Sequence, residues 1–454
     1  MDEVTENRTP ADLTRALAEK ATALRYGGLP APVRELAGQC ILDYLGVALA
    51  AAQDPLVQIL LDEMAEAGGS PQASIIGHSA RLPVLSAALV NGSAAHALDY
   101  DDVNMAMPGH PSVAILPGLL ALAELRGSSG REVVTAFVDG YETACRIGAA
   151  LQLGHYNLGF HSTGTVGTFG AAAACAHLLG LGVEATAMAL GIAGTQAAGL
   201  KSQFGTMCKP FHAGKAAQNG LLAARLAQRG FSSRTDIVEC VQGFALTHGP
   251  DFSREAALAT PEGGFHLLAN LFKYHAACYF THAPIECARR LRAERRLTPE
   301  VIAGITLRLD ASCDRVCNIP VPVDGLQSKF SLRQTVAMAL AGVDTASLDV
   351  YSAENTRDAA LVGLRERVRF DWQHNWPQTL CELELELFGG PRLTTRHDAG
   401  IPAADIAEQG DRLAAKFDVL VAPVLGAPRA REFREMISDL DNVADIRSLT
   451  RLTA

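Results

Sequence analysis

Residues 164–200 read GTVGTFGAAAACAHLLGLGVEATAMALGIAGTQAAGL. The segments 164–179 and 184–200 are rich in alanine and glycine, and a Gly-Leu-Gly break separates them. Small side chains let helix axes approach closely, so we expect a buried helical hairpin at the centre of a helical domain. A membrane span is the alternative, but His177 and Glu184 interrupt the apolar run, and we expect no membrane partner.

The segments on either side of this stretch also carry helical signals. A capping-box sequence at 129–132, SGRE, precedes apolar residues at helical spacing from Val133 onward. Helix follows helix in this way up to about residue 265, and the helical pattern returns after residue 402. We therefore predict a large all-helical domain over residues 1–265, completed by residues 402–454.

The pattern changes between these two helical regions. ITLRL at 305–309 and CELELEL at 381–387 alternate with a period of two, and VRFDW at 368–372 is a third strand candidate. Helical stretches lie between them. The sequence thus predicts a mainly α chain with an inserted smaller α/β (α+β) domain over residues 266–401, whose antiparallel sheet has one solvated face.

Composition excludes several functional classes. The 454 residues carry a formal net charge of −10, which argues against a nucleic-acid partner. The ten cysteines form no C-x-x-C pair, so we expect reduced thiols and no iron–sulfur or structural zinc site. The first residues, MDEVTENRTP, contain no apolar signal core, which predicts a cytoplasmic protein.

The first candidate site is HALDYDDVNMAMPGHPS at 96–112. Asp99, Asp101 and Asp102 repel one another, so they must be exposed, paired with cations or partly protonated. The proline after His110 favours an extended histidine just before a helix, where its basicity falls and an anion can bind. The alternative is an acidic loop with a capping histidine. The spacing matches no strong metal motif, and we expect no metal.

The second candidate site is GFHSTGT at 159–165. Its hydroxyl residues are typical of a helix start, so simple helix capping explains the motif. The functional alternative is that His161 and the free backbone N–H groups of this helix start bind an anion.

The third candidate site is the densest cationic stretch of this acidic chain. Only seven of the 39 basic residues are lysine, yet Lys201, Lys209 and Lys215 fall within fifteen residues that also contain His212. Proline and two glycines predict a shaped loop that runs into a helix from Ala216. Such charges suit carboxylate recognition, whereas a solvated surface loop is the alternative.

The last candidates are Lys273-Tyr274-His275, His282 and the segment QSKFS at 327–331. Hydrogen-bonded core histidines and an ordinary helix start are their structural alternatives. The chain contains no phosphate-binding glycine loop and no Gly-x-Ser-x-Gly elbow. The remaining Asp, His and Lys side chains suit abstraction of a proton next to a carboxylate, with cationic donors stabilising the resulting charge.

These segments, in this order, resemble the MmgE/PrpD family, which includes 2-methylcitrate dehydratases, cis-aconitate decarboxylases and iminodisuccinate epimerases. The likeness spans about residues 10–420. The sequences that carry it are HALDYDDVNMAMPGHPS, HSTGTVGTFGAAAA, AGTQAAGLKSQFGTMCKPFHAGKAAQNG, KYHAACYFTHAPIE and KFSL. The resemblance implies an all-helical domain with an inserted smaller domain, an active site between them, a homodimer and no required cofactor.

The resemblance also implies site residues. By matching motifs, the pocket residues of decarboxylase-like members fall on Asp99, His110, His161, Lys209, His212 and His282. Two departures weaken the decarboxylase assignment: Val103 stands where a threonine is expected, and Gln334 where a pocket tyrosine is expected.

Our leading sequence-based hypothesis is a hydro-lyase that resembles 2-methylcitrate dehydratase and acts on a small di- or tricarboxylate. Catalysis is expected from Asp99, His110, His161, Lys209 and His282. Binding is expected from His212, Lys215, Lys201, Lys273 and Gln334. The alternatives are an iminodisuccinate epimerase-like isomerase, a cis-aconitate decarboxylase-like enzyme, a metal-dependent hydratase and, in another class, a non-catalytic carboxylate-binding protein.

Overall fold

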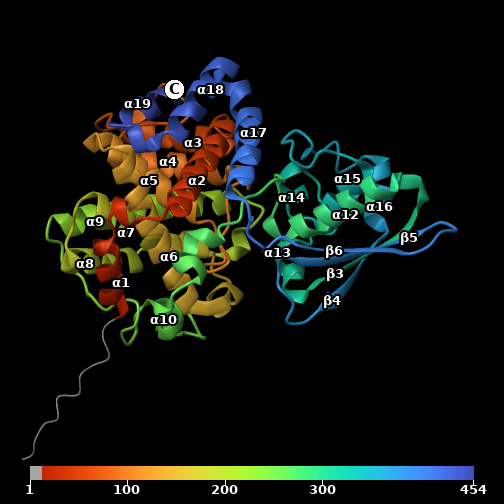
Figure 1. The fold of residues 1–454 in the computed structure, drawn as a ribbon, viewed down its shortest axis with the longest axis horizontal. Coiled ribbons are helices and arrows are strands. Elements are labelled where there is room, and N and C mark those ends of the chain that lie inside the picture. Colours follow the sequence, from red (N-terminus) through yellow and green to blue (C-terminus); the bar gives the residue numbers. More distant parts are fainter. Residues whose placement is uncertain (1–12, 454) are drawn as a thin grey trace, which may run out of the picture.

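The computed structural model describes residues 13–453, and the N-terminal stretch quoted above lies outside them. Within these residues the chain forms nineteen α-helices and two small sheets, so the predicted mainly α class is confirmed. Figure 1 shows a larger helical lobe beside a smaller lobe that contains a sheet.

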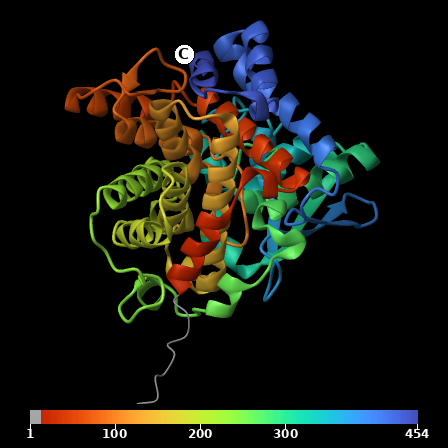
Figure 2. The same cartoon turned by 60° about the vertical axis from the view of Figure 1, so that its left-hand side comes forward.

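The larger lobe contains the first eleven α-helices and the last three. They are α1 (Leu13–Ala23), α2 (Ala31–Ala50), α3 (Pro55–Ala67), α4 (Val84–Ala97), α5 (Pro111–Arg126), α6 (Gly130–Leu158), α7 (Ser162–Leu178), α8 (Val183–Gly194), α9 (Cys208–Gln228), α10 (Phe244–His248), α11 (Arg254–Leu258), α17 (Ile406–Leu425), α18 (Ala427–Ser438) and α19 (Arg447–Thr450). A short hairpin, β1 (Ala73–Ser74) and β2 (Arg81–Leu82), packs against α4. Both α17 and α18 pack against α2, so the C-terminal segment returns to the larger lobe (Figure 2).

Helix α7, which contains the first half of the small-residue stretch, lies at the centre of the larger lobe. All its residues from Ser162 to Ala176 are buried, and it packs against α5, α6, α8 and α9. A Cβ atom on Gly170 would lie only 2.9 Å from Cβ of Ala144 on α6, so glycine permits this close approach. The expected buried hairpin is confirmed, although α8 ends at Gly194 and residues 195–200 are not helical.

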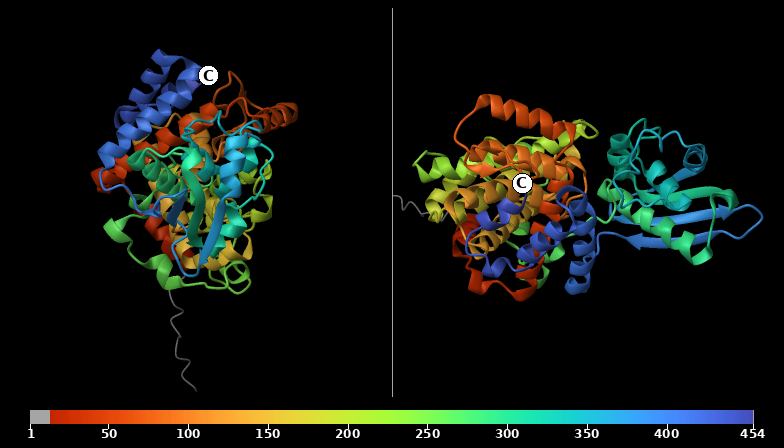
Figure 3. Two further views of the ribbon diagram at one scale, coloured as in Figure 1. Left: turned by 90° about the vertical axis from the view of Figure 1, so that its right-hand side faces the viewer. Right: turned by 90° about the horizontal axis from the view of Figure 1, so that it is seen from above.

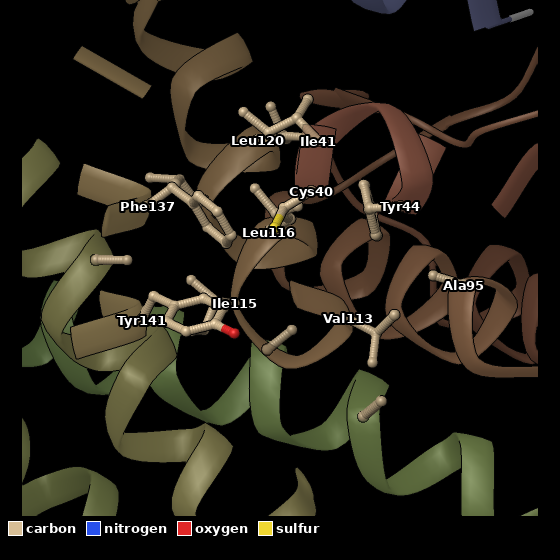
Figure 4. Close-up of a cluster of buried hydrophobic side chains, with 14 of the residues drawn as sticks. Cys40, Ile41, Tyr44, Ala95, Val113, Ile115, Leu116, Leu120, Phe137 and Tyr141 are labelled. Carbon is tan, nitrogen blue, oxygen red and sulfur yellow. The ribbon is translucent and has the colours of Figure 1, made fainter. Parts of the chain in front are cut away.

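One part of the core of the larger lobe is formed by side chains of α2, α4, α5 and α6. Figure 4 shows Cys40, Ile41, Tyr44, Phe137 and Tyr141 packed together with aliphatic residues of α5. Among residues 13–453, no single helix is both long and apolar enough to cross a membrane; α2 and α3 meet that test only together, across an 87° bend.

The smaller lobe combines five helices with one four-stranded sheet (Figure 3). Its elements are α12 (His282–Arg295), β3 (Ile302–Asp310), α13 (Asp314–Cys317), α14 (Gly325–Ser328), α15 (Leu332–Ala341), α16 (Ala359–Glu366), β4 (Val368–Gln373), β5 (Leu380–Leu387) and β6 (Leu393–Asp398). The strand order is β4-β3-β5-β6, and α12 packs against β5 and β6.

The sheet, expected to be antiparallel, is mixed. Strand β3 pairs with β5 in the antiparallel sense but with β4 in the parallel sense. The reason is the long helical crossover between β3 and β4, which returns the chain in the direction of β3. The alternation in β5 is as expected: Leu383 and Leu385 are buried, whereas Glu382 pairs with Arg308 at 2.6 Å on the other face.

The chain passes from one buried core to the other close to residue 278. Leu267, Phe272 and Ala277 belong to the larger core, whereas Cys278 belongs to the smaller one. The domain limits of 1–265, 266–401 and 402–454 remain predictions. The crossing segment is important for function because it borders the candidate active site.

Candidate active site

Three long helices begin at one pocket. His110 is the residue immediately before α5, His161 is the residue immediately before α7, and Lys209 lies in the first turn of α9. All three line the same pocket, hereafter the first pocket. The N-terminus of a helix carries partial positive charge and unpaired backbone N–H groups. The pocket is therefore suited to bind an anion, although the chain as a whole is negative.

The first pocket lies between the two cores. From the larger lobe, Asp99, Gly109, His110, His161 and Lys209 form its polar wall. The rest of the lining is mainly apolar: Val103, Met105, Pro108, Tyr156, Phe204, Cys278, Tyr279, Phe280, Val316 and Phe330. A ligand in this pocket would thus have charged groups on one side and hydrocarbon on the other.

Asp99 is held between two lysines. Its Oδ1 accepts hydrogen bonds from Lys209 Nζ at 2.6 Å and from Lys273 Nζ at 2.8 Å, and Lys273 is fully buried. Burial raises the pKa of Asp99, but the two lysines outweigh it and hold the pKa well below its usual value. Its Oδ2 has no hydrogen-bond partner, and its φ of 52° is unusual for a non-glycine residue.

Asp101 lies between two histidines. His96 Nδ1 lies 2.9 Å and His110 Nδ1 3.0 Å from this carboxylate. Burial raises the pKa of Asp101, but the two imidazoles outweigh it, so the group is ionised. Because His110 Nδ1 is also 2.8 Å from the carbonyl oxygen of Asp102, its proton belongs on Nδ1. This tautomer leaves Nε2 of His110 as a proton acceptor.

His161 is part of a stack of neutral imidazoles. Its Nδ1 lies 3.0 Å from Nδ1 of His212, and its ring stacks on His96 at 5.7 Å between centroids. Burial, together with the neighbouring His96 and Lys209, holds the pKa of His161 well below its usual value. Burial likewise lowers the pKa of His212 to about 4. Both rings are therefore uncharged at neutral pH.

Lysines also hold the backbone of the acidic segment. Lys329 donates to the carbonyl of Leu98 at 2.5 Å, and Lys273 donates to that of Asp99 at 2.8 Å. Lys416 on α17 donates to the carbonyl of Tyr100 at 2.7 Å. Together with Lys209, which contacts Asp99, four of the seven lysines in the chain thus contact residues 98–102.

The side chains of His96, Asp99, Asp101 and His110 could geometrically hold a metal ion, because their ligand atoms lie within 4.8 Å of one another. Both carboxylates already have partners, however. Two lysines contact Asp99, and two imidazoles contact Asp101. A divalent cation would have to bind next to two ammonium groups, so this donor set fits a metal poorly.

Comparison with known proteins identifies the family. The model of the MmgE/PrpD N-terminal domain matches residues 15–255, and that of the MmgE/PrpD C-terminal domain matches residues 275–442. The chain belongs to the MmgE/PrpD family.

Three similar proteins are named as cis-aconitate decarboxylases or as a cis-aconitate decarboxylase-like protein. A cis-aconitate decarboxylase of Aspergillus terreus is 25% identical over 477 residues, covering 98% of this chain and 97% of the relative. A human cis-aconitate decarboxylase is 27% identical over 460 residues, covering 97% and 94%. The cis-aconitate decarboxylase-like protein oryM of Aspergillus oryzae is 31% identical over 306 residues, covering 64% and 63%. These relatives indicate that the MmgE/PrpD chain is an enzyme of the lyase type.

Of the site residues predicted from sequence, some do not line the first pocket of this MmgE/PrpD chain. Lys201 donates to the carbonyl of Tyr156, and Lys215 donates to Gln218 at 2.5 Å. Residues 208–215 are helical where a loop was expected, and Lys215 does not line the first pocket. Gln334 is buried in the smaller lobe, where Arg365 donates to it at 2.9 Å.

His282 lines a second pocket, not the first. This second pocket also contains His275, Glu286, His397 and Arg412, and it shares Tyr279 with the first. The motif match placed the histidine that begins α12 in the active site. In the structure, Cys278, Tyr279 and Phe280 are the members of this segment that line the first pocket.

Sequence reasoning assigned no catalytic or binding role to five contributors to the site, although His96, Asp101 and Lys329 lie in its candidate segments. The five are His96, Asp101, Cys278, Lys329 and Lys416. The rarity of lysine was a usable signal for the last two, because a chain that places most surface charge on arginine keeps lysine for special positions. No comparable signal distinguished Cys278 from the nine other cysteines.

Proposed function

We propose that this MmgE/PrpD chain is a metal-independent lyase that cleaves a small di- or tricarboxylate through a carbanion. The convergence of three helix N-termini and Lys209 on one half-apolar pocket carries this proposal. Bond cleavage next to a carboxylate leaves an electron pair that spreads onto carboxylate oxygens. Preorganised donors around those oxygens lower the barrier without a metal.

The residues of the first pocket have separable roles in this proposal. Lys209 and the backbone N–H groups at the start of α7 bind the substrate carboxylates. In dehydration Nε2 of His110 accepts the α proton, whereas decarboxylation needs no base; Asp101 keeps the His110 ring in the required tautomer and stabilises the charge that forms. Asp99, fixed by Lys273, orients Lys209.

We place decarboxylation first among the lyase reactions. The named relatives are cis-aconitate decarboxylases, and the apolar wall of the first pocket supports the same chemistry here. A carboxylate against Phe280, Val316 or Phe330 loses its hydration, whereas the CO₂ that it releases is uncharged and needs none.

Dehydration, our leading hypothesis from the sequence, is the second candidate. It shares the carbanion-forming step, and Nε2 of His110 is suited to abstract the α proton. The acid that assists departure of hydroxide must come from the first pocket. His282 lines the second pocket and is therefore not placed in this role.

The test is proton NMR of the purified protein with cis-aconitate, 2-methylcitrate and related acids in D₂O. Decarboxylation is expected to give new vinyl signals with release of CO₂, and dehydration to give an alkene from a hydroxy acid. Proton exchange without net product would instead favour an epimerase. Tight binding without any of these changes would favour a non-catalytic carboxylate-binding protein.

Treatment with a chelator distinguishes the proposed metal-independent lyase from a metal-dependent hydratase. We expect full activity after dialysis against EDTA, because two lysines already neutralise Asp99 and two imidazoles already contact Asp101. Loss of activity that Mg²⁺, Mn²⁺, Fe²⁺ or Zn²⁺ restores would contradict the proposal. The proposal also includes a cytoplasmic location and a homodimer. Cell fractionation tests the location, and light scattering tests the oligomeric state.

A further inference from the structure

Cys278 has a fixed position in the first pocket. It is buried in the smaller core and precedes the short turn at Tyr279–Thr281. Its backbone N–H donates to the carbonyl oxygen of Lys329 at 2.9 Å, and its own carbonyl accepts from the hydroxyl of Thr281 at 2.7 Å. Hydrogen bonds to its backbone N–H and carbonyl groups thus fix Cys278 in the first pocket. Cys278 belongs to the smaller core, whereas His110 belongs to the larger lobe.

The residues of the smaller lobe that line the first pocket form one side of it, hereafter the smaller-core wall. This wall offers few groups that can exchange a proton. Among its described lining residues, Phe280, Val316 and Phe330 are hydrocarbon. Tyr279 carries a hydroxyl group, but this donates to the carbonyl of Ala399 at 2.5 Å. Tyr156 also belongs to the smaller core and lines the pocket, but burial raises the pKa of its hydroxyl well above the usual value, so the thiol of Cys278 is the group on this wall that gives up a proton more readily.

The charges around Cys278 support such a role. A hydrogen bond from the thiol of Cys317 lowers the pKa of Cys278, burial opposes this, and Lys273 and Lys209 lower it further. The net pKa lies below the usual value of a thiol. The same pocket contains the unpartnered, buried Oδ2 of Asp99, which is a second, independent sign that a ligand belongs there.

We propose that Cys278 is a catalytic residue that protonates the substrate carbon from the smaller-core wall. The proposal rests on the lyase function above. When the carbon–carbon bond breaks, CO₂ leaves and its electron pair stays on the substrate carbon. That carbon takes the proton of the thiol, so a C–H bond forms as the S–H bond breaks. The thiolate, stabilised by Cys317 and the lysines, regains a proton from water after product release.

Selective alkylation tests the position and environment of this thiol without any enzyme assay. The thiolate displaces iodide from iodoacetate, a carboxylate, or from the neutral iodoacetamide, and peptide mass spectrometry locates the adduct. At Cys278 we expect the iodoacetate-to-iodoacetamide rate ratio to be about 10-fold or more above that at exposed Cys208, with protection by tricarballylate. A similar ratio at both cysteines, or absence of protection, would overturn the proposal.

Substitution tests the catalytic step. Cys278→Ser and Cys278→Ala are expected to lower kcat by about 100-fold with little change in KM, because proton transfer is lost while carboxylate binding remains. Cys287→Ser is the matched control, since this buried thiol lies on α12 outside the first pocket. Circular dichroism confirms the fold of each variant. A folded Cys278→Ala protein with wild-type kcat would refute the role.

The pH profile adds a readout that a merely structural role would not move. Cys317→Ala removes the hydrogen bond to Cys278, so the limb of the kcat profile that reports the thiol should shift to higher pH. An unshifted profile would refute the role. If no tested acid is turned over, the lyase proposal fails, and the alkylation result alone then decides whether Cys278 is a reactive group of a carboxylate pocket.

Discussion

At the scale of single residues, Asp99 determines how the site is held together. Its burial is costly, and contacts from Lys209 and Lys273 on the same oxygen compensate that cost. Its backbone is in the left-handed region, which is uncommon for a non-glycine residue. Removal of its charge should therefore affect the fold as well as the chemistry.

Asp99→Asn should lower the free energy of unfolding by about 3–5 kcal/mol, because two buried ammonium groups lose their counter-charge. Urea unfolding followed by circular dichroism measures the change. Asp418→Asn, which removes a partly exposed ion pair with Arg434, is the control and should change it by about 0.5 kcal/mol or less. Equal effects of the two substitutions would contradict this account.

Lys209→Gln should lower kcat/KM roughly 100-fold or more, because the pocket loses its cation while Lys273 still pairs with Asp99. Lys215→Gln is a matched control on the same helix, since its side chain contacts Gln218 and does not line the first pocket. Steady-state kinetics with the substrate identified by NMR measure both. A comparable loss in both variants would argue against the assigned role of Lys209.

Asp102→Asn should make stability less sensitive to pH. Burial raises the pKa of Asp102 to about 7, above that of an unfolded aspartate, so folding favours the protonated form. The wild type therefore loses stability as the pH rises from about 4 to 7. Between pH 4 and pH 8, the free energy of unfolding of the variant should rise relative to that of the wild type by on the order of 1–4 kcal/mol. Urea titrations at both pH values that give a constant difference would contradict this prediction.

Much of the site could be predicted at this scale, because aspartate, histidine and lysine in short motifs carry the chemistry. Asp99, His110, His161 and Lys209 do converge. Their neighbours could not be predicted equally well. Which residue of the segment 273–282 reaches the first pocket depends on the turn at 279–281, and no spacing rule specifies that turn.

At the scale of elements, the close packing of α6 and α7 fixes where α7 begins and thereby where His161 lies. At Gly140 of α6, an added Cβ would meet the carbonyl oxygen of Gly170 at 2.5 Å. Such a contact cannot be relieved by a side-chain rotation, because the atom that is approached belongs to the backbone.

Gly140→Ala should therefore lower the free energy of unfolding by about 1–3 kcal/mol through overpacking. Gly363→Ala on α16 is the control: its Cβ would have no neighbour within 4 Å, and alanine favours a helix by up to about 1 kcal/mol. Thermal and urea unfolding of both variants test the contrast. A stabilised Gly140→Ala protein would show that α6 and α7 pack less closely than described.

The elements themselves were predictable where the hydrophobic period was strong. Strand β5 carries seven alternating residues and was expected within one residue of its observed ends. Strand β6, with the sequence LTTRHD, lacks such alternation and was missed. The parallel pairing of β3 with β4 depends on the path of a long crossover, which local periodicity does not encode.

At the scale of the whole molecule, a chain with a net charge of −10 forms a local positive site. Three helix N-termini and Lys209 supply the positive potential, and the larger part of the remaining lining is apolar. The larger lobe thus provides charge, and the smaller lobe excludes water and contributes Cys278. Neither lobe alone contains the complete pocket.

The most direct measurement is a crystal structure with tricarballylate, a saturated tricarboxylate that cannot complete the reaction. We predict the ligand between His110, His161 and Lys209, with one carboxylate within hydrogen-bond distance of Lys209 Nζ and another near the start of α7. Tricarballylate bound in the second pocket beside His282, with the first pocket empty, would contradict the central claim that the helix N-termini form the substrate site.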